Sequence, residues 1–225
     1  MGVPGTASSI LGLMLAAALL GGCAGILPRA PEAPTATYLL APDRPPGDRD
    51  LGLGGAGVSG PTLLVSRPEA AAGYDSRRMA YLEQDYRLDT FAGSEWVDAP
   101  AAMLGPLLVR VLKDRAAFGA VSEDGRGIRA DLRLDTVIES LYQDFRTRPS
   151  QARVALRVRL VDPDGQRILA TRVFADAEPA PSDDPYGGVV AANRALARLL
   201  PRIADLAAET AAGFQAGAPK AEPGR

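Results

Sequence analysis

The clearest pattern of apolar and polar positions in this chain is a strict alternation over residues 152–161. The apolar positions are Val154, Leu156, Val158 and Leu160. A period of two is typical of a strand with one buried face. Residues 162–165, with the sequence Asp-Pro-Asp-Gly, have the composition of a turn, and residues 166–175 return as a second strand. The pattern therefore predicts a β-hairpin.

Other segments also have the composition or alternation of strands. They are residues 36–40, 62–66, 78–82 and 130–145. The last is the longest, with Leu132 and Leu134 on one phase and later apolar residues on another. Alternation that slips partway along a strand indicates a bulge, so we expect one long bulged strand in this segment.

Two segments, residues 98–118 and 189–212, repeat apolar residues at spacings of three and four, which predicts amphipathic helices. Asp98 is the expected N-cap of the first helix. Each segment contains a proline. Because proline removes a backbone donor and clashes with the preceding turn, Pro106 predicts either a kink or a helix that begins nearer Gly105.

The order of these elements predicts an α+β fold, a mainly antiparallel sheet with two helices packed on one face. It resembles the sandwich domains of the TolB N-terminal and LptE-like types. We expect four parts: a signal peptide over 1–22, a tether over 23–61 with a short first strand near 36–40, the folded domain over 62–212, and a disordered tail over 213–225.

The N-terminus carries the most specific motif. Residues 10–20 form an uncharged apolar run that suits a secretory signal and is shorter than the roughly 20 residues that a membrane-spanning helix needs. The lipobox that follows is Leu20, Gly21, Gly22 and Cys23. We predict cleavage before Cys23 and lipidation of its thiol. The alternatives are that Cys23 is an ordinary apolar residue in a soluble export signal or in an uncleaved anchor.

Two further details of this segment bear on sorting and anchoring. Residues 1–9 lack Lys and Arg, which departs from the usual positive start of a signal peptide. Residue 24 is Ala rather than Asp, and by resemblance to enterobacterial sorting rules this favours the outer membrane. Several acyl chains would anchor the protein stably, whereas one chain gives only marginal binding.

Composition removes several classes of function. The chain has no histidine, a single cysteine and a net charge of −2 from 25 basic and 27 acidic residues. Imidazole-based catalysis and imidazole metal sites therefore have no ligands, and no basic excess exists to bind nucleic acid. We expect a protein that is not an enzyme and that has no metal and no cofactor. A hydrolase that uses carboxylates is the weakest alternative.

Several segments resemble one family in their order and spacing. They are the lipobox at 20–23, Tyr38-Leu39-Leu40, residues 77–82, Phe91, Glu95-Trp96, residues 98–100, the apolar helix at 103–112, residues 130–134 and the hairpin. Together they resemble the ABC-type transport auxiliary lipoproteins, the PqiC-like partners of MCE-domain lipid transporters. The resemblance covers nearly the whole mature domain, and only Gly105-Pro106 within the first helix departs from it.

The resemblance implies a periplasmic domain, held to the outer membrane by N-terminal acyl chains, that works with an ABC permease, an ATPase and an MCE-domain protein. The implied role is auxiliary and non-enzymatic, in transport of lipids between membranes. Candidate partners are the membrane, an MCE-domain protein, a lipid and further copies of the chain. The alternative is a structural assembly lipoprotein, LptE-like or TolB-like, for an outer-membrane complex.

The candidate partner-contact residues are Trp96, Tyr81, Arg153, Arg157 and Arg159. Aromatic and arginine side chains are enriched at the centres of interfaces. Each group has a plainer interpretation, which we prefer: Trp96 as a core residue where strand meets helix, and the arginines as a solvated strand face.

Overall fold

The computed structural model describes residues 34–42, 60–115, 117–123, 129–163 and 167–217. All but Pro34 belong to one compact unit, Thr35–Arg225. The strands are β1 (Ala36–Tyr38), β2 (Thr62–Val65), β3 (Glu69–Ala70), β4 (Arg78–Gln84), β5 (Arg87–Trp96), β6 (Ala120–Ser122), β7 (Leu132–Asp144), β8 (Gln151–Val161) and β9 (Ile168–Pro179). The helices are α2 (Pro100–Lys113) and α3 (Pro185–Gly217).

The described strands form one mixed sheet that is organised around β7. Along one edge, β7 pairs antiparallel with β8, which pairs antiparallel with β9. Three short strands, β2, β3 and β4, pair in parallel with successive parts of β7. The sheet is extended from β4 by antiparallel β5, and from β2 by parallel β6. The longest pairings are therefore the antiparallel ones.

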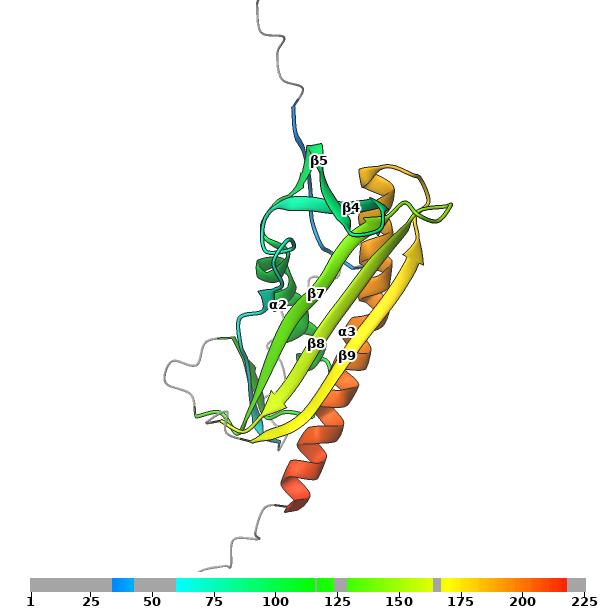
Figure 1. Ribbon diagram of the computed structural model, residues 1–225. Coiled ribbons are helices and arrows are strands. Elements are labelled where there is room, and N and C mark those ends of the chain that lie inside the picture. The colour runs from blue at the N-terminus through cyan, green and yellow to red at the C-terminus, as the bar shows by residue number, and fades with distance from the viewer. Residues whose placement is uncertain (1–33, 43–59, 116, 124–128, 164–166, 218–225) are drawn as a thin grey trace, which may run out of the picture. The chain divides into compact units, whose positions relative to one another are not determined.

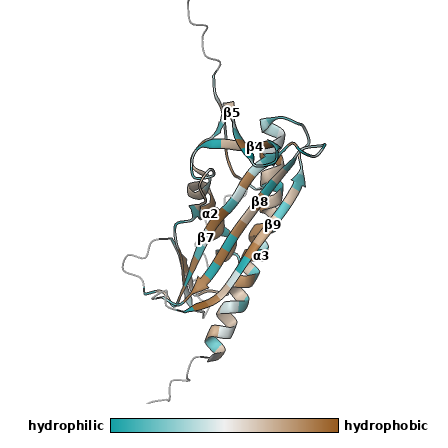
Figure 2. Ribbon diagram, in the orientation of Figure 1, coloured by the Kyte–Doolittle hydropathy of each residue, from teal (hydrophilic) through white to brown (hydrophobic). Residues whose placement is uncertain are grey.

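Both helices pack on the same side of the sheet, so the predicted α+β architecture is confirmed. Figure 1 shows α3 running behind β8 and β9, with α2 beside it. The alternation along β7 and β8 is visible as brown and teal bands in Figure 2. Apolar side chains of one phase, among them Leu134, Leu156 and Leu160, are almost fully buried. Burial of such side chains is the main stabilising contribution to a domain of this size.

Most predicted strands are confirmed. The segments at 36–40, 62–66, 78–82 and 130–145 correspond to β1, β2, β4 and β7, and the register shift between Ile138 and Ser140 is the expected bulge. The predicted hairpin is β8–β9, although residues 164–166 of its turn lie outside the described residues. Strands β3, β5 and β6 were not predicted.

The first helix differs from its prediction at both ends. It begins at Pro100, runs through Gly105 and Pro106, and ends at Lys113, so a start near Gly105 is wrong. Its N-cap is Ala99 without a side-chain cap. The Asp98 carboxylate instead accepts a hydrogen bond from the Ala99 N–H, just before the helix (2.7 Å).

The second helix is longer than predicted. It begins at Pro185 because Asp184 caps it, with Oδ1 accepting from the Gly187 N–H at 2.7 Å, and proline is well suited to the first helical position. It continues to Gly217, where a disordered tail from residue 213 was expected. Phe214 packs against the core, which explains the extension. Residues 218–225 lie outside the described part of the chain.

β1 is at one end of the sheet's strand order, and the residues that follow it contact α3. It pairs in parallel with β5, with Ala36 opposite Ser94. Beyond the strand, Asn193 of α3 accepts from the Ala41 N–H (2.6 Å) and donates to the Leu39 carbonyl (3.3 Å).

Candidate functional site

The predicted lipidation and cleavage residues, Cys23 with Leu20, Gly21 and Gly22, lie outside the described residues, so anchoring stays a prediction. Within the described ranges, neither helix is long and apolar enough to span a bilayer. The same part of the chain holds no cluster of three or more side chains suited to a metal ion.

The three predicted arginines lie on the outer face of β8, and each forms an ion pair with a carboxylate of β7; only Arg159 is directly opposite its partner in the register. The pairs are Arg153–Asp144 at 2.7 Å, Arg157–Glu139 at 2.9 Å and Arg159–Asp135 at 3.9 Å. The arginine side chains are 41–47% exposed. This face is therefore a ladder of paired charges rather than a cationic surface, in agreement with the plainer interpretation.

The two predicted aromatic residues have different surroundings. Trp96 is only 4% exposed and belongs to the core, so its interpretation as a surface contact is wrong and the core interpretation is right. It is the last residue of β5 and lines a pocket together with Gly188 and Ala192 of α3. Tyr81 of β4 is half-buried, with Phe91 at 4.6 Å and Phe145 at 5.9 Å between ring centroids.

Several aromatic and polar side chains lie close together at the end of β7. Five consecutive residues there, 142–146, take part in aromatic or polar contacts. Tyr142 stacks on Tyr74 with ring centroids 6.4 Å apart, and Phe145 completes the aromatic cluster with Tyr81 and Phe91. The polar members of this stretch, at positions 143, 144 and 146, face a pocket and an ion network.

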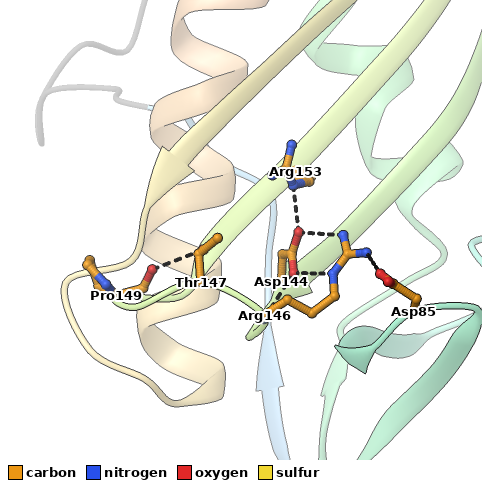
Figure 3. Close-up of polar contacts among 6 residues, drawn as sticks. All are labelled: Asp85, Asp144, Arg146, Thr147, Pro149 and Arg153. Atoms are coloured by element: carbon orange, nitrogen blue, oxygen red, sulfur yellow. Dashed lines mark hydrogen bonds and ion pairs between the residues drawn. The ribbon is translucent and has the colours of Figure 1, made fainter.

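The ion network is centred on Asp144, whose side chain is 1% exposed (Figure 3). Arg146 binds it through two nitrogens, both at 2.8 Å, and through its backbone N–H at 3.1 Å. Arg153 donates to the same carboxylate at 2.7 Å, and Arg146 reaches on to Asp85 in the β4–β5 turn. The network thus ties the β4–β5 hairpin to the β7–β8 hairpin.

Electrostatics favour the charged form of this network. Hydrogen bonds from the Arg146 side chain hold the pKa of Asp144 well below its usual range, against the opposing effect of burial. The pKa of Arg146 is raised in turn by its bonds to Asp144 and Asp85. Because two guanidinium groups face two carboxylates, the network is neutral and has no excess charge to offer a ligand.

A pocket lies where β4, β5, β7, β8 and the first turns of α3 meet. It is lined by Met79, Ala80, Phe91, Trp96, Leu141, Tyr142, Gln143, Ala152, Gly188 and Ala192. The lining is mostly apolar and carries no carboxylate, ammonium or guanidinium group. The pocket is partly open, and it adjoins the aromatic cluster through Phe91.

Gln143 is the polar residue that stands out in this lining. It is buried, and its amide N–H donates to Ser150 Oγ at 2.8 Å. Its Oε1 accepts no hydrogen bond from any described residue. A Cβ on Gly188 would lie 2.3 Å from this oxygen, so only glycine allows α3 to approach so closely.

The sequence analysis missed Asp144, Arg146 and Gln143. Two signals pointed to them: Gln143 occupies a position of the long strand whose neighbours in phase are apolar, and Asp144 lies two residues from an arginine. Neither signal specifies a partner, because Asp85 and Gly188 are far away along the chain.

The chain matches the family model of the ABC-type transport auxiliary lipoprotein component over residues 42–204. It is similar to a solved structure of a DUF330-family protein from Xanthomonas campestris, at 25% identity and a TM-score of 0.63, covering 69% of this chain and 88% of that one.

A hypothetical protein from Chlamydia trachomatis shares the fold at 7% identity and a TM-score of 0.51, covering 69% of this chain and 99% of that one. The search of curated proteins found no match. The family match spans most of the chain and agrees with the resemblance seen in the sequence. The protein therefore belongs to the ABC-type transport auxiliary lipoprotein family.

Proposed function

We propose that this protein is a lipid-anchored auxiliary component of an MCE/ABC-type intermembrane lipid transport system, held to the periplasmic face of the outer membrane through Cys23. The observation that carries the proposal is the family match over residues 42–204, preceded in the sequence by the lipobox that ends at Cys23. The family is described by a transport role, and the proposed role is non-enzymatic.

The geometry of the domain supports a docking role. Tyr81, Phe91 and Phe145 form a half-buried aromatic cluster beside the β4–β5 hairpin, and Tyr86 at the tip of that hairpin is fully exposed. Aromatic side chains on a rigid support are favourable contacts for a protein partner. Arg146 of the ion network centred on Asp144 also pairs with Asp85 of this hairpin.

Cross-linking in intact envelopes, followed by pull-down of the full-length tagged chain, tests the partner. We expect an MCE-domain protein to be recovered. A Cys23→Ser variant, which keeps the whole domain but removes the acylated thiol, is the matched control and should recover much less of it. Recovery of an outer-membrane barrel or secretin in its place would favour the assembly lipoprotein.

Mass spectrometry of the mature protein tests the anchor separately. We expect an N-terminal Cys23 that carries a thioether-linked diacylglycerol and an N-acyl chain, in the outer-membrane fraction. An unmodified cysteine, or a leader still attached, contradicts the anchoring part of the proposal. The family assignment would be unaffected by that result.

A further inference from the structure

We propose that the end of the domain at which the chain enters β1 rests on the surface of the lipid bilayer, through an apolar patch formed by Leu39, Val97 and Tyr186. The proposal rests on the proposed function, because it requires the acyl anchor at Cys23. It deepens that function by naming the face that the anchored domain turns toward the membrane. The occupant of the patch is the lipid surface itself.

The patch consists of exposed apolar side chains that lie far apart in the sequence. Leu39 is 54% exposed, Val97 is 52% exposed and Tyr186 is 62% exposed. Exposed apolar side chains that stand alone are ordinary, whereas a group of them marks a contact site. The remaining large apolar side chains that are exposed in the described part of the chain lie elsewhere, on the β4–β5 hairpin or on β9: Tyr86, Leu88, Ile168 and Val173.

Tyr38 makes the patch continuous. Its carbonyl accepts a hydrogen bond from the Val97 N–H at 2.7 Å, so Leu39, the next residue, lies beside Val97. On the other face of the strand, the ring of Tyr38 lies 6.5 Å from that of Tyr186 between centroids. Because β1 is an end strand of the sheet, both faces meet at its free edge. Figure 1 shows β1 and the beginning of α3 at the same end of the domain, and the beginning of β9 at the opposite end.

The anchor brings this end of the domain to the membrane. Cys23 precedes Ala36 by 13 residues, and a chain of that length spans at most about 45 Å. The helix α3 has 33 residues, which corresponds to about 50 Å, and it runs away from this end of the domain. The patch is therefore the apolar surface that the anchor keeps nearest to the bilayer. Attachment by a short chain gives a high effective concentration, at which even a weak contact is populated.

The composition of the patch suits a lipid surface rather than a charged one. Aliphatic side chains enter the boundary between headgroups and acyl chains, and a tyrosine is stable there because its ring is apolar and its hydroxyl is polar. Arg77 and Arg78 lie beside Glu95, which pairs with Arg77 at 2.6 Å. Asp98 and Asp184 add two carboxylates. The surroundings therefore carry no excess of positive charge, and we expect an apolar contact that does not require anionic lipids.

The test uses the full-length acylated chain, isotope-labelled, in phosphatidylcholine nanodiscs that contain a small fraction of a lipid with a gadolinium chelate on its headgroup. Paramagnetic broadening, which falls steeply with distance, is measured at the backbone N–H groups. We expect loss of the signals of Leu39, Val97 and Tyr186 and retention of those of Ile168 and Val173 in β9. Nanodiscs that also contain phosphatidylglycerol should give the same result.

Two double variants separate contact with the bilayer from mere closeness to the anchor. Leu39→Gln with Val97→Thr keeps the size of both side chains and removes apolar surface, so the Tyr186 signal should return although the anchor is unchanged. Ile168→Thr with Val173→Thr, at similarly exposed positions of β9, is the matched control and should leave the Tyr186 signal lost. All four positions are exposed, and the dispersion of the spectrum shows that each variant is folded.

Mass spectrometry and co-elution with the nanodiscs check the anchor in the same samples, so failures of the two proposals are distinguishable. A chain without acyl groups that elutes apart from the nanodiscs would contradict the anchor, and the membrane contact with it. An acylated chain in the nanodisc whose patch signals persist would overturn the membrane contact alone. Broadening that is unchanged in Leu39→Gln with Val97→Thr, or that appears only with phosphatidylglycerol, would also overturn it.

Discussion

The β7–β8–β9 region and the β4–β5 hairpin of this domain are built in different ways. In the first region, β8 is paired along its whole length with a strand on each side, and its arginines face carboxylates of β7. In the second, the register between β4 and β5 shifts twice, and four residues of β5 lie between the partners of Arg78 and Ala80. Each pairing of the first region has a single register shift, so the two regions differ in how continuous their pairing is, and they meet at the end of β7.

The β7–β8–β9 region supplies most of the buried apolar surface of the sheet, whereas the β4–β5 hairpin leaves aromatic side chains accessible. The long strands β7 and β8 bury a nearly continuous apolar face on the side of the sheet that carries α3, while Ile168 and Val173 of β9 are exposed. The bulged hairpin instead leaves Phe91 half-buried beside Tyr81 and places Tyr86 in solvent. Bulges are common next to functional sites because they redirect side chains. The same substitution should therefore have very different effects in the two regions.

The largest expected effect is that of Leu156→Ala in β8. Leu156 is almost fully buried, and truncation of a buried leucine removes apolar contacts and leaves a cavity, so the free energy of unfolding should fall by about 3 kcal/mol. Leu88→Ala, the same change at a 40% exposed position of β5, should cost less than about 0.5 kcal/mol. Urea denaturation measures both, and similar values for the two would remove the distinction between the regions.

The second-largest effect is expected at the ion network that joins the β4–β5 and β7–β8 hairpins. Asp144→Asn leaves Arg146 and Arg153 without their shared carboxylate and should lower the free energy of unfolding by about 2 kcal/mol, less than for a fully buried pair, since both arginines are partly exposed. Asp85→Asn, at an exposed position, is the control and should cost under about 0.5 kcal/mol. A cost for Asp144→Asn no larger than that of its control would show that the network does not hold the hairpin.

The same carboxylate predicts a pH dependence. The pKa of Asp144 is lowered in the folded protein, so its stabilising contribution is present above the pKa of the unfolded chain and is lost as the pH falls below about 4. The wild type should thus lose more of its free energy of unfolding than Asp144→Asn does when the pH falls from 6 to about 3. Chemical denaturation at several pH values measures this convergence, and parallel curves for the two proteins would contradict it.

A smaller effect is expected at the contact between α3 and β7. Gly188→Ala would place a methyl group against the Gln143 amide, and we expect a cost of about 1 kcal/mol after the better helix propensity of alanine is included. Gly213→Ala in the same helix meets open space and should stabilise the protein by about 0.5 kcal/mol. Thermal unfolding compares them, and effects of the same sign would argue against the close approach.

The smallest effect is at the hairpin tip. Tyr86 has a φ of 65° and a fully exposed side chain, a conformation that asparagine adopts more readily than tyrosine. Tyr86→Asn should therefore stabilise the domain by about 0.5 kcal/mol while removing an aromatic contact from the proposed docking surface. Stability and recovery of the partner are measured on the same variant, and a loss of stability would mean that the tyrosine ring has contacts in the folded protein.

The sequence predicted strands correctly where one apolar period continues over many residues. The alternation in β8 and the slipped phase of β7 predicted both strands and the bulge, because the face on which each side chain lies follows directly from the period of two. β5 was missed because its bulge interrupts the alternation, and β3 and β6 are too short to show a pattern. The end of α3 was missed because a single aromatic residue, Phe214, extends the helix beyond its regular apolar stripe.

The candidate site was less predictable than the fold. Tyr81 and Trp96 were candidate contact residues on the basis of residue type; for Trp96 the preferred core interpretation agrees with its burial, while the contact role of Tyr81 stays a prediction. Gln143 and Asp144 depend on contacts with Gly188, Ser150 and Asp85, which only the tertiary structure brings together. The charges of the three arginines were predicted, but the carboxylates that face them lie on a neighbouring strand in a register that alternation alone does not specify.

The attachment of β1 has a mechanical consequence. A pull on the chain before Ala36 that is directed along β1 loads the ladder with β5 in shear. The hydrogen bonds of the ladder run across the strands, so they share this force. Leu39 and Ala41 follow β1, and their backbone groups are hydrogen-bonded to Asn193 of α3. Force that is transmitted past the ladder therefore reaches this long helix. Force on the chain before Ala36 is therefore divided between β5, which belongs to the aromatic hairpin, and the long helix α3.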